Sequence, residues 1–192
     1  VYNMNENRED YLLVVNSNRA SIVADHLKKH MGSFKADVKN EDGVFGKIDL
    51  QGPKSAEILR KVLEKGSIDG LKYFHFLGDY DAAKNNDVRL KGDIPVLLSR
   101  TGYTGEDGFE LFVPNANAVK LWEALAAAGE PFGLTPAGLA ARDSLRLEAG
   151  MPLYGHELGL DITPFESGLG RLVEIALEKK TVDFVGRTAL TE

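Results

Sequence analysis

Cysteine is absent from the 192-residue sequence. The chain therefore cannot form a disulfide, use a thiolate nucleophile or hold a metal or iron–sulfur cluster through cysteine ligands. Long apolar runs are absent as well, since no stretch of the sequence approaches the roughly 20 apolar residues that span a bilayer. These absences exclude a disulfide scaffold, argue against an integral membrane protein and are compatible with a reducing compartment.

An excess of basic residues is also missing. The sequence has 23 Lys and Arg against 29 Asp and Glu, which gives a net charge of −6. Nucleic acids and anionic membranes attract basic surfaces, so this charge argues against non-specific binding to either. Hydrophobic residues make up 43% of the chain, which is enough for a buried core in one ordinary domain or two small ones. We therefore expect a globular protein with neither a nucleic-acid nor a membrane partner.

The N-terminal part of the sequence predicts a strand followed by a helix. Residues 11–16 form a short apolar run of the kind that favours a β-strand. Apolar residues then recur at helical spacing, and Asn16 or Asn18 could cap the start of the helix. The expected apolar stripe of this helix consists of Val23, Leu27 and Met31.

Residues 34–66 predict a hairpin and a second helix. Residues 34–38 and 45–50 alternate apolar and polar side chains around the turn sequence of residues 40–43, which favours an antiparallel hairpin. Pro53 follows at a position typical of a first helical turn, and apolar residues then recur at helical spacing. Gly66 is the expected end of that helix.

Further elements follow a polar stretch, residues 78–93, that is expected to be an excursion or a hairpin. Residues 94–99 and 109–113 are predicted strands on either side of a glycine-rich turn. The helix after them is expected to be capped by Asn115 and to bury Ala118, Leu121, Trp122 and Leu125. A last helix is expected from Thr135-Pro136 to about Ala149.

The order of these elements predicts the fold class. Strands with two crossing helices in the order βαββαβ indicate an α+β fold, a ferredoxin-like layer extended by extra strands and a helix. Residues 1–150 are expected to form this core. Residues 151–192 contain several Gly and Pro and two short apolar runs, and they are expected to extend the core toward a further domain.

Residues 101–111 carry the most distinctive motif, Thr-Gly-Tyr-Thr-Gly-Glu-Asp-Gly-Phe-Glu-Leu. Glycines at 102, 105 and 108 let the backbone approach another surface closely or adopt a positive φ. A phosphate-binding loop is disfavoured, because the Lys-Ser/Thr ending is missing and Glu106 and Asp107 would repel an anion.

Glu110 lies on the strand that follows this motif. Because side chains alternate along a strand, Glu110 shares a face with Gly108 and Phe112. A carboxylate beside a glycine gap and an aromatic ring could hold a flat heterocycle and accept two parallel N–H bonds from its edge. The alternative is an ordinary solvent-facing glutamate on a half-exposed strand.

Arg142 is a second candidate, on the last predicted helix. At helical spacing it shares a stripe with small or apolar residues, namely Gly138, Leu145 and Ala149. Arg146 one turn further on would repel it, whereas Asp143 can pair with Arg146 at i,i+3. The partner of Arg142 is therefore expected elsewhere, either a carboxylate in a structural ion pair or a ligand oxygen.

No metal site is expected. His26 and His30 have the spacing of helical metal ligands, but no carboxylate accompanies them, and a solvent-exposed flank of the helix is favoured. His156 lacks the second histidine of a zinc-protease helix, since position 160 is Leu.

Four stretches together resemble the aminomethyltransferase (T-protein) family of the glycine cleavage system. They are residues 11–16 with Asn18, residues 48–55 (Ile-Asp-Leu-Gln-Gly-Pro-Lys-Ser), residues 100–111 and residues 138–155. The resemblance covers nearly the whole chain. Folate domains of sarcosine and dimethylglycine dehydrogenases share the fold, as does an iron–sulfur-assembly protein whose Lys-Gly-Cys-Tyr motif a chain without cysteine does not contain.

The resemblance implies a one-carbon transferase of glycine catabolism. In that family an aminomethyl group on the lipoyl arm of a carrier protein (H-protein) is transferred to tetrahydrofolate, which releases ammonia and gives methylene-tetrahydrofolate. Tetrahydrofolate is the co-substrate, and no metal is implied. By position, Glu110 matches the glutamate that binds the pterin edge, and Arg142 matches an arginine of the same pocket. Tyr103 resembles a folate-contacting tyrosine, and Asn16 resembles a pocket asparagine.

The sequence departs from the family at an upstream acidic pair and at Met151, which stands where some relatives have a pocket tyrosine and is therefore not expected to be a ligand. Family members place an Asp-Asp pair shortly before the Val-Tyr that opens this chain, so the catalytic aspartate is expected upstream of Val1. The family's C-terminal barrel would follow residue 192, and we expect the chain alone to be inactive. The expected compartment is the cytoplasm for a bacterial protein and the mitochondrial matrix for a eukaryotic one. The alternatives are a folate domain of a sarcosine or dimethylglycine dehydrogenase-like enzyme and a non-catalytic folate-binding module.

Overall fold

The computed structural model describes residues 1–5, 7, 9–16, 18–81, 83–84, 87–180 and 182–191. They divide into two compact units. The first unit combines Val1–Leu13 with Glu41–Ala149, and the second combines Val14–Asn40 with Gly150–Glu192. Among the described residues, no helix is long and apolar enough to cross a membrane.

A four-stranded antiparallel sheet forms the centre of the first unit. Its strands lie in the order β3 (Phe45–Gln51), β9 (Gly108–Pro114), β8 (Leu97–Ser99) and β5 (Phe76–Gly78). β3 and β9 pair along their full length of seven residues, with Asp49 opposite Glu110. On its other side Glu110 lies opposite Ser99 of β8. The register therefore brings polar side chains of three strands together in one row.

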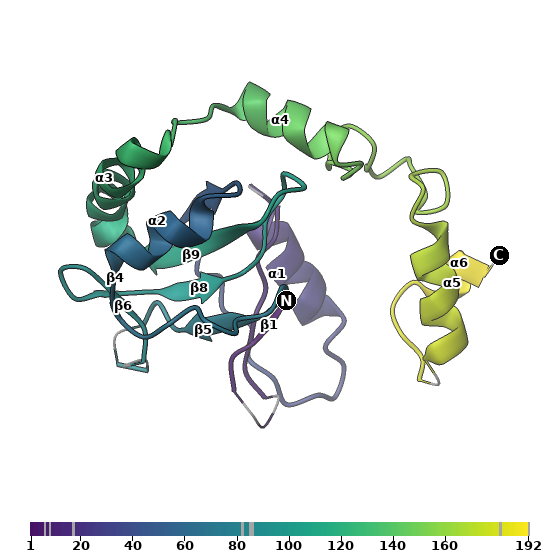
Figure 1. The fold of residues 1–192 in the computed structure, drawn as a ribbon. Helices are drawn as coiled ribbons and strands as arrows, with labels where there is room; N and C mark the ends of the chain where they lie inside the picture. The colour runs from purple at the N-terminus through teal and green to yellow at the C-terminus, as the bar shows by residue number, and fades with distance from the viewer. Residues whose placement is uncertain are drawn as a thin grey trace. The chain divides into compact units, whose positions relative to one another are not determined.

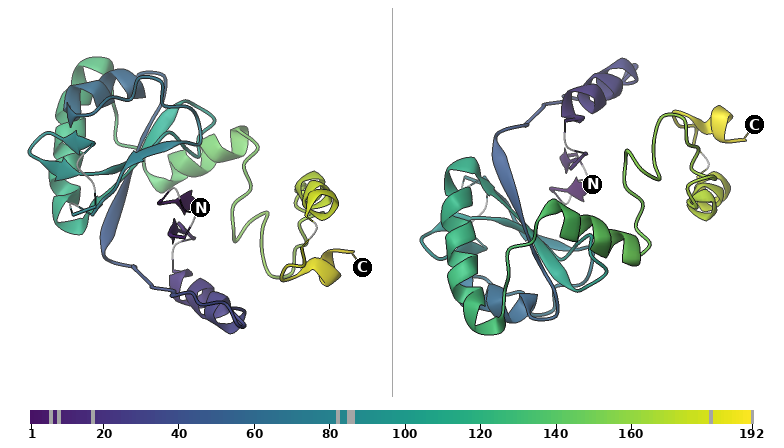
Figure 2. Two further views of the ribbon diagram at one scale, coloured as in Figure 1. Left: turned by 90° about the horizontal axis from the view of Figure 1, so that it is seen from below. Right: turned by 90° about the horizontal axis from the view of Figure 1, so that it is seen from above.

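Two helices cover one face of this sheet. α2 (Ser55–Val62) and α3 (Ala118–Gly129) lie side by side (Figure 1 and Figure 2). β9 directs Phe109, Leu111 and Val113 toward them, since alternate residues of a strand share a face. These side chains join a buried cluster that includes Ile58, Leu59, Val62, Leu121 and Leu125. Removing this apolar surface from water is the main favourable contribution to the stability of the unit.

Shorter elements complete the first unit. β1 (Tyr2–Asn3) pairs with β2 (Tyr11–Leu12), and a three-stranded sheet contains β4 (Leu63–Lys65), β6 (Arg89–Leu90) and β7 (Ile94–Pro95). Two 3-10 helices flank α3, namely η1 (Asn115–Asn117) and η2 (Glu130–Phe132), and α4 (Leu139–Glu148) follows.

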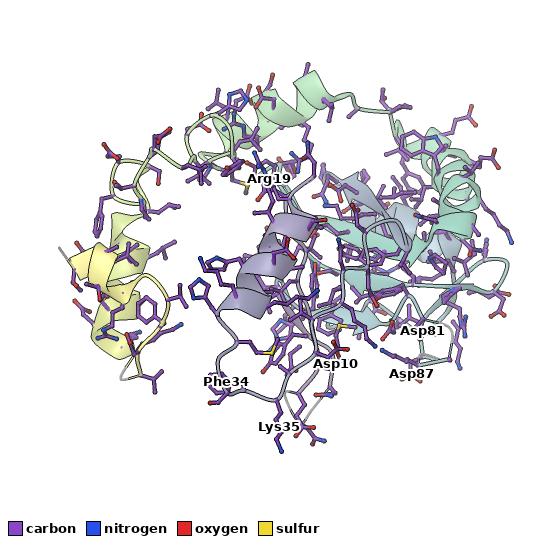
Figure 3. All side chains as sticks on the ribbon, turned by 180° about the vertical axis from the view of Figure 1, so that it is seen from behind. Asp10, Arg19, Phe34, Lys35, Asp81 and Asp87 are labelled. Atoms are coloured by element: carbon purple, nitrogen blue, oxygen red, sulfur yellow. The ribbon has the colours of Figure 1, made fainter. Side chains whose placement is uncertain are left out.

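The second unit is helical and has a small core. It contains α1 (Ala20–Lys29), α5 (Gly170–Lys179) and α6 (Arg187–Thr191). Of the residues of this unit that the structure describes, Ala24 alone is buried. Arg19, labelled in Figure 3, precedes α1, and its guanidinium carbon lies 5.1 Å from the ring centre of Tyr154.

The α+β class is confirmed, and so are several elements. The strand expected at residues 109–113 is β9, and the helix expected after Pro53 is α2. The helix expected after Asn115 is α3, which buries Leu121 and Leu125 as predicted. The polar stretch 78–93 includes residues 82, 85 and 86, which lie outside the described residues.

The predicted hairpin of residues 34–38 with 45–50 is wrong. Residues 34–38 form no strand, and Phe34 lies exposed beside Lys35 on the loop after α1 (Figure 3). β3 pairs instead with β9, far along the chain. Alternation of apolar and polar residues identifies a strand but does not identify its partner, and pairing with β9 lets β3 bury Leu50 against the two helices.

Two predicted helix boundaries and one buried residue are also wrong. α2 ends at Val62, and the extended backbone of Leu63 leads directly into β4, so Gly66 does not end the helix. α4 begins at Leu139 and not at Thr135. Trp122 is 49% exposed, because Leu121 and Leu125 form the buried face of α3 and Trp122 does not lie on that face.

The predicted caps of α1 and α3 are wrong as well. The N-cap position of α1 is Arg19, with no side-chain cap, while Asn18 adopts a positive φ of 54°. The strand before α1 is limited to Tyr11–Leu12. Asn117 is the N-cap of α3, and Asn115 instead donates a hydrogen bond from Nδ2 to the carbonyl of Gly43. Polar side chains near a helix start have several possible partners, and tertiary contacts select among them.

Leu121→Ala should lower the free energy of unfolding of the first unit by about 2–5 kcal/mol, because Leu121 is fully buried and its truncation leaves a cavity. Val119→Ala, at a residue of the same helix that is 69% exposed, should change it by less than about 0.5 kcal/mol. Urea denaturation of the two variants measures the difference. Equal effects would contradict the placement of the core.

Candidate functional site

Glu110 lies on the face of the sheet opposite to α2 and α3. Aromatic rings surround it on this face: the ring centre of Tyr2 lies 5.7 Å from that of Phe112 and 5.3 Å from that of Phe76, both in edge-to-face geometry. The side chain of Glu110 is only 16% exposed. A carboxylate this buried is costly unless hydrogen bonds or an opposite charge satisfy it.

Three side chains satisfy the Glu110 carboxylate. Lys47 of β3 donates a hydrogen bond to Oε1, and the hydroxyl of Thr101 donates to Oε2. The hydroxyl of Tyr2 approaches Oε2 at 3.5 Å. Lys47 Nζ also lies 3.1 Å from Oδ1 of Asp49, so one cation serves two carboxylates. The cluster combines groups from β1, β3, β9 and the loop after β8.

Electrostatics keep this cluster ionised. Burial raises the pKa of Glu110, but the charge of Lys47 and the hydrogen bonds from Lys47, Thr101 and Tyr2 more than offset it, so the pKa lies below its ordinary value. Burial lowers the pKa of Lys47, but Asp49 and Glu110 outweigh it and the pKa is raised. Both groups are therefore charged at neutral pH.

The loop of residues 101–107 is closed at its base by an ion pair. Arg100 binds both carboxylate oxygens of Asp107, with Nε 2.9 Å from Oδ1 and Nη2 2.8 Å from Oδ2. The same guanidinium donates to the carbonyl of Leu71 at 2.8 Å. The hydrogen bond from Arg100 lowers the pKa of Asp107 despite the opposing effect of burial. This planar, two-point contact holds the loop where its residues reach Glu110.

Glycines of this loop permit a close approach, as predicted. A Cβ atom at Gly102 would lie 2.1 Å from Oε1 of Gln51, and a Cβ atom at Gly108 would lie 2.0 Å from the same oxygen. Gly105 provides a positive φ of 79° at the tip of the loop. The surface that Gly102 and Gly108 approach is thus a side chain of β3, whereas Gly105 faces Ala149.

A cleft of about 360 Å³ opens beside β3 in the first unit. Its walls come from β3, the glycine-rich loop, α3, residues 134–137 and α4. They are largely apolar, with Leu50, Trp122, Leu125, Leu134, Pro136 and Leu145 among them. Tyr103 and Arg142 line it as well, and the guanidinium carbon of Arg142 lies 4.5 Å from the centre of the Tyr103 ring. Such a cation–π contact places a charged donor at an otherwise apolar wall.

Comparison with known proteins identifies the family. Residues 1–177 match the family described as "GCVT N-terminal domain". The chain belongs to this family. It is 50% identical over 192 residues to an aminomethyltransferase from Streptomyces avermitilis and 46% identical over 192 residues to one from Streptomyces coelicolor. It covers 47% of the length of each, so the chain spans about half the length of these curated relatives.

A solved structure is similar in both fold and sequence. The crystal structure of glycine cleavage system aminomethyltransferase T from Bartonella henselae matches with a TM-score of 0.70 and 31% sequence identity. The match covers 92% of this chain and 43% of that chain. The α+β arrangement described above is therefore an arrangement found in a glycine cleavage protein.

In this GCVT domain, two of the residues singled out in the sequence lie together. Tyr103 and Arg142 stack on each other at the cleft, while Glu110 belongs to the neighbouring polar cluster. Asp49 connects the two, because it lines the cleft and also lies within ion-pair distance of Lys47. Asn16 lies in the second unit, where its carbonyl accepts a hydrogen bond from the backbone of Arg19 at 3.1 Å.

The helix that carries Arg142 differs from the sequence-based expectation. Gly138 and Ala149 are exposed and Leu145 is 39% exposed, so the predicted packed stripe is wrong. Arg146 is the buried arginine, at 2% exposure, and it pairs with Asp143 at 2.7 Å as expected from the i,i+3 spacing. Helical spacing alone does not reveal which of two faces turns toward the rest of the unit.

Among the residues that the structure describes, no group of three or more His, Asp or Glu side chains could hold a metal ion. Three aspartates labelled in Figure 3 lie toward one end of the first unit, namely Asp10, Asp81 and Asp87. Nζ of Lys84 lies 3.8 Å from Oδ2 of Asp10. A lysine at this position balances part of the local negative charge.

Residues around Glu110 that the sequence did not single out are Tyr2, Lys47, Thr101 and Gln51. One signal could have identified some of them. Lys47 and Gln51 are two residues away from Asp49 on either side, so the three share a strand face. The pairing of that face with Glu110 required the register of β3 against β9.

Lys47→Met should raise the pKa of Glu110, because burial then acts without the opposing charge. In the unchanged protein the lowered pKa means that Glu110 contributes stability above its unfolded-state pKa and loses this contribution as the pH falls through the folded-state pKa. Carbon-13 NMR titration of the carboxyl groups measures the change. Lys54→Met, which removes an exposed lysine paired with Glu57 on α2, should leave the pKa of Glu110 unaltered. An unchanged pKa in Lys47→Met would contradict the assigned role of Lys47.

Proposed function

We propose that this GCVT domain binds tetrahydrofolate as part of an aminomethyltransferase of the glycine cleavage system. Relatives of up to 50% identity carry the name aminomethyltransferase, and the similar Bartonella henselae structure is titled a glycine cleavage system protein. These names favour the glycine cleavage reaction over the demethylating dehydrogenases and over a non-catalytic module. The observation that carries the proposal is the buried and ionised carboxylate of Glu110.

The acceptor capacity of Glu110 suits a pterin edge. A carboxylate offers about four lone-pair sites. Among the described residues, Lys47 uses one site on Oε1, while Thr101 and Tyr2 use those on Oε2. The Tyr2 contact is the longest, at 3.5 Å, and is the weakest of the three. A pterin that donates two parallel N–H groups would take the open site on Oε1 and replace Tyr2 on Oε2.

The neighbouring cleft suits the remainder of the ligand. Its volume of about 360 Å³ and its apolar walls match a site that holds a flat aromatic molecule. Arg142 stays charged and, stacked on Tyr103, can donate to a ligand oxygen. Asn16 remains a proposed pocket residue on the resemblance alone.

The proposed reaction passes a one-carbon unit between two carriers. An aminomethyl group leaves a lipoyl arm of the H-protein, ammonia is released, and tetrahydrofolate receives the carbon as methylene-tetrahydrofolate. We assign binding and orientation of the folate to Glu110, Tyr103 and Arg142, and no proton transfer to any of them. The bacterial origin of the relatives supports a cytoplasmic protein.

Glu110→Gln in the intact protein should weaken tetrahydrofolate binding about tenfold, because an amide loses the charge-assisted acceptor pair. Glu57→Gln, at an exposed glutamate of α2, is the matched control and should not alter the dissociation constant. Isothermal titration calorimetry measures both. An unaltered dissociation constant in Glu110→Gln would return Glu110 to the role of a structural ion-pair partner of Lys47.

Arg142→Lys should weaken folate binding more than Arg60→Lys does. Lysine keeps the charge but lacks the planar group that stacks on Tyr103, and that contact contributes about 0.5–1 kcal/mol at an exposed site. Arg60 is a surface arginine paired with Asp69 at 2.9 Å, which makes it a better control than the buried Arg146. Equal dissociation constants for the two variants would remove Arg142 from the site.

A further inference from the structure

Gln51 is the only glutamine of the chain, and it ends β3 directly opposite Gly108. Its Nε2 donates two hydrogen bonds, to the carbonyl of Thr101 at 3.2 Å and to the carbonyl of Phe109 at 3.3 Å. These acceptors lie on the two sides of the glycine-rich loop. One side-chain amide thus joins the start of the loop at Thr101 to β9, the strand that follows the loop.

The other end of this amide is buried in a space formed by glycines. Oε1 of Gln51 is a buried acceptor with no hydrogen-bond partner among the described residues. The three atoms nearest to a Cβ added at Gly102 would all belong to the amide of Gln51, with Oε1 at 2.1 Å and Cδ at 2.8 Å. At Gly108 it would meet Oε1 at 2.0 Å and also the carbonyl of Leu50 at 2.9 Å.

An unpartnered buried acceptor costs free energy that an apolar side chain of the same shape would not. A glutamine at this position therefore has a use other than packing, and the two hydrogen bonds that Nε2 donates supply it. Both residues that accept these bonds are connected to Glu110. The hydroxyl of Thr101 donates a hydrogen bond to the Glu110 carboxylate, and Phe109 precedes Glu110 on β9. Displacing the amide would release the Thr101 backbone and with it a hydrogen bond to the carboxylate.

We propose that Gln51 is a positioning residue that, through Thr101 and Phe109, holds the Glu110 carboxylate in the orientation that receives the ligand. The ligand part of this inference rests on the proposed folate binding. The positioning part rests on the geometry of the described chain alone. Gln51 acts on the carboxylate through the backbone of the loop and of β9.

The first test replaces Gln51 with methionine, which keeps the length of the side chain and removes both donors. In the intact protein, Gln51→Met should raise the pKa of Glu110, measured by carbon-13 NMR, because Thr101 no longer donates steadily to the carboxylate. Tetrahydrofolate affinity should fall about fivefold under conditions in which urea denaturation shows the variant to be fully folded, because the carbonyls of Thr101 and Phe109 lose their donor and stability falls as well. An unchanged Glu110 pKa, or a fall in affinity that only follows a fall in stability, would overturn the proposal.

A matched control lies at the other end of the same strand pair. Asn115 also uses a side-chain amide to fix a backbone carbonyl, that of Gly43. Asn115→Leu should leave the Glu110 pKa and the folate affinity unaltered, whatever its effect on stability. A comparable change in either quantity would mean that any loosening of β3 has the same effect, and Gln51 would have no special role.

A double-mutant cycle tests whether Gln51 acts through Glu110. If it does, Gln51→Met in the Glu110→Gln background should weaken tetrahydrofolate binding by less than about twofold, because the residue that Gln51 positions is already impaired. Additive losses would overturn the proposal. If the unchanged protein binds no tetrahydrofolate, the proposed function fails, and the Glu110 pKa in Gln51→Met still decides whether Gln51 is a positioning residue.

The glycine contact provides an independent measurement. Gly102→Ala should displace the amide and reproduce the raised Glu110 pKa of Gln51→Met, because the three atoms nearest to the new Cβ all belong to Gln51. In the Gln51→Ala background the same substitution should have no further effect. A full effect of Gly102→Ala in that background would show that the glycine serves another purpose.

Discussion

The antiparallel pairing of β3 with β9 is the constraint on which the site depends. It places Asp49 opposite Glu110 and Gln51 opposite Gly108. The polar cluster around Glu110 and the hydrogen bonds from Gln51 to the glycine-rich loop and β9 therefore both follow from one register. A slip of one residue would direct Glu110 into the apolar core and Phe109 to the other face. The core holds that register, because β9 buries Phe109, Leu111 and Val113 against α2 and α3.

The same pairing brings Lys47 of β3 to the buried negative charge of Glu110 on β9. Glu110 would be protonated more readily if burial acted alone, but Lys47 and the hydroxyl donors keep it ionised. The third contact, from Tyr2, is the longest of the three, and it is the one that the proposed ligand would replace. Lys47 and Thr101 would keep the carboxylate satisfied with or without that ligand.

The two arginines of α4 differ in their burial and in their partners. Arg146 is buried and paired with Asp143, whereas Arg142 is partly exposed and stacks on Tyr103. Both lie one turn apart on the same helix, and the sequence pattern favoured the wrong face as the packed one. Arg142 thus presents its charge at the cleft, where the proposed function assigns it to a ligand oxygen.

Much of this protein can be predicted from its sequence because the signals are local. The α+β class, β9, α2, the buried pair Leu121 and Leu125, and the close approach at Gly102 and Gly108 all follow from side-chain alternation, helical spacing and the small size of glycine. Glu110 could be singled out from side-chain alternation, whereas Tyr103 was named only from the family resemblance. Arg142 was singled out from a helical stripe that the structure does not pack.

Partners that are distant in sequence were decided by the tertiary structure. The alternation of β3 does not say that its partner is β9, and the caps of α1 depend on which polar groups lie nearby after folding. Lys47, Thr101 and Tyr2 meet at Glu110 only once the register is set, and no spacing in the chain reports that meeting. A sequence determines which residues can form a strand, a helix or an ion pair, but the competition among all buried surfaces selects the pairs that form.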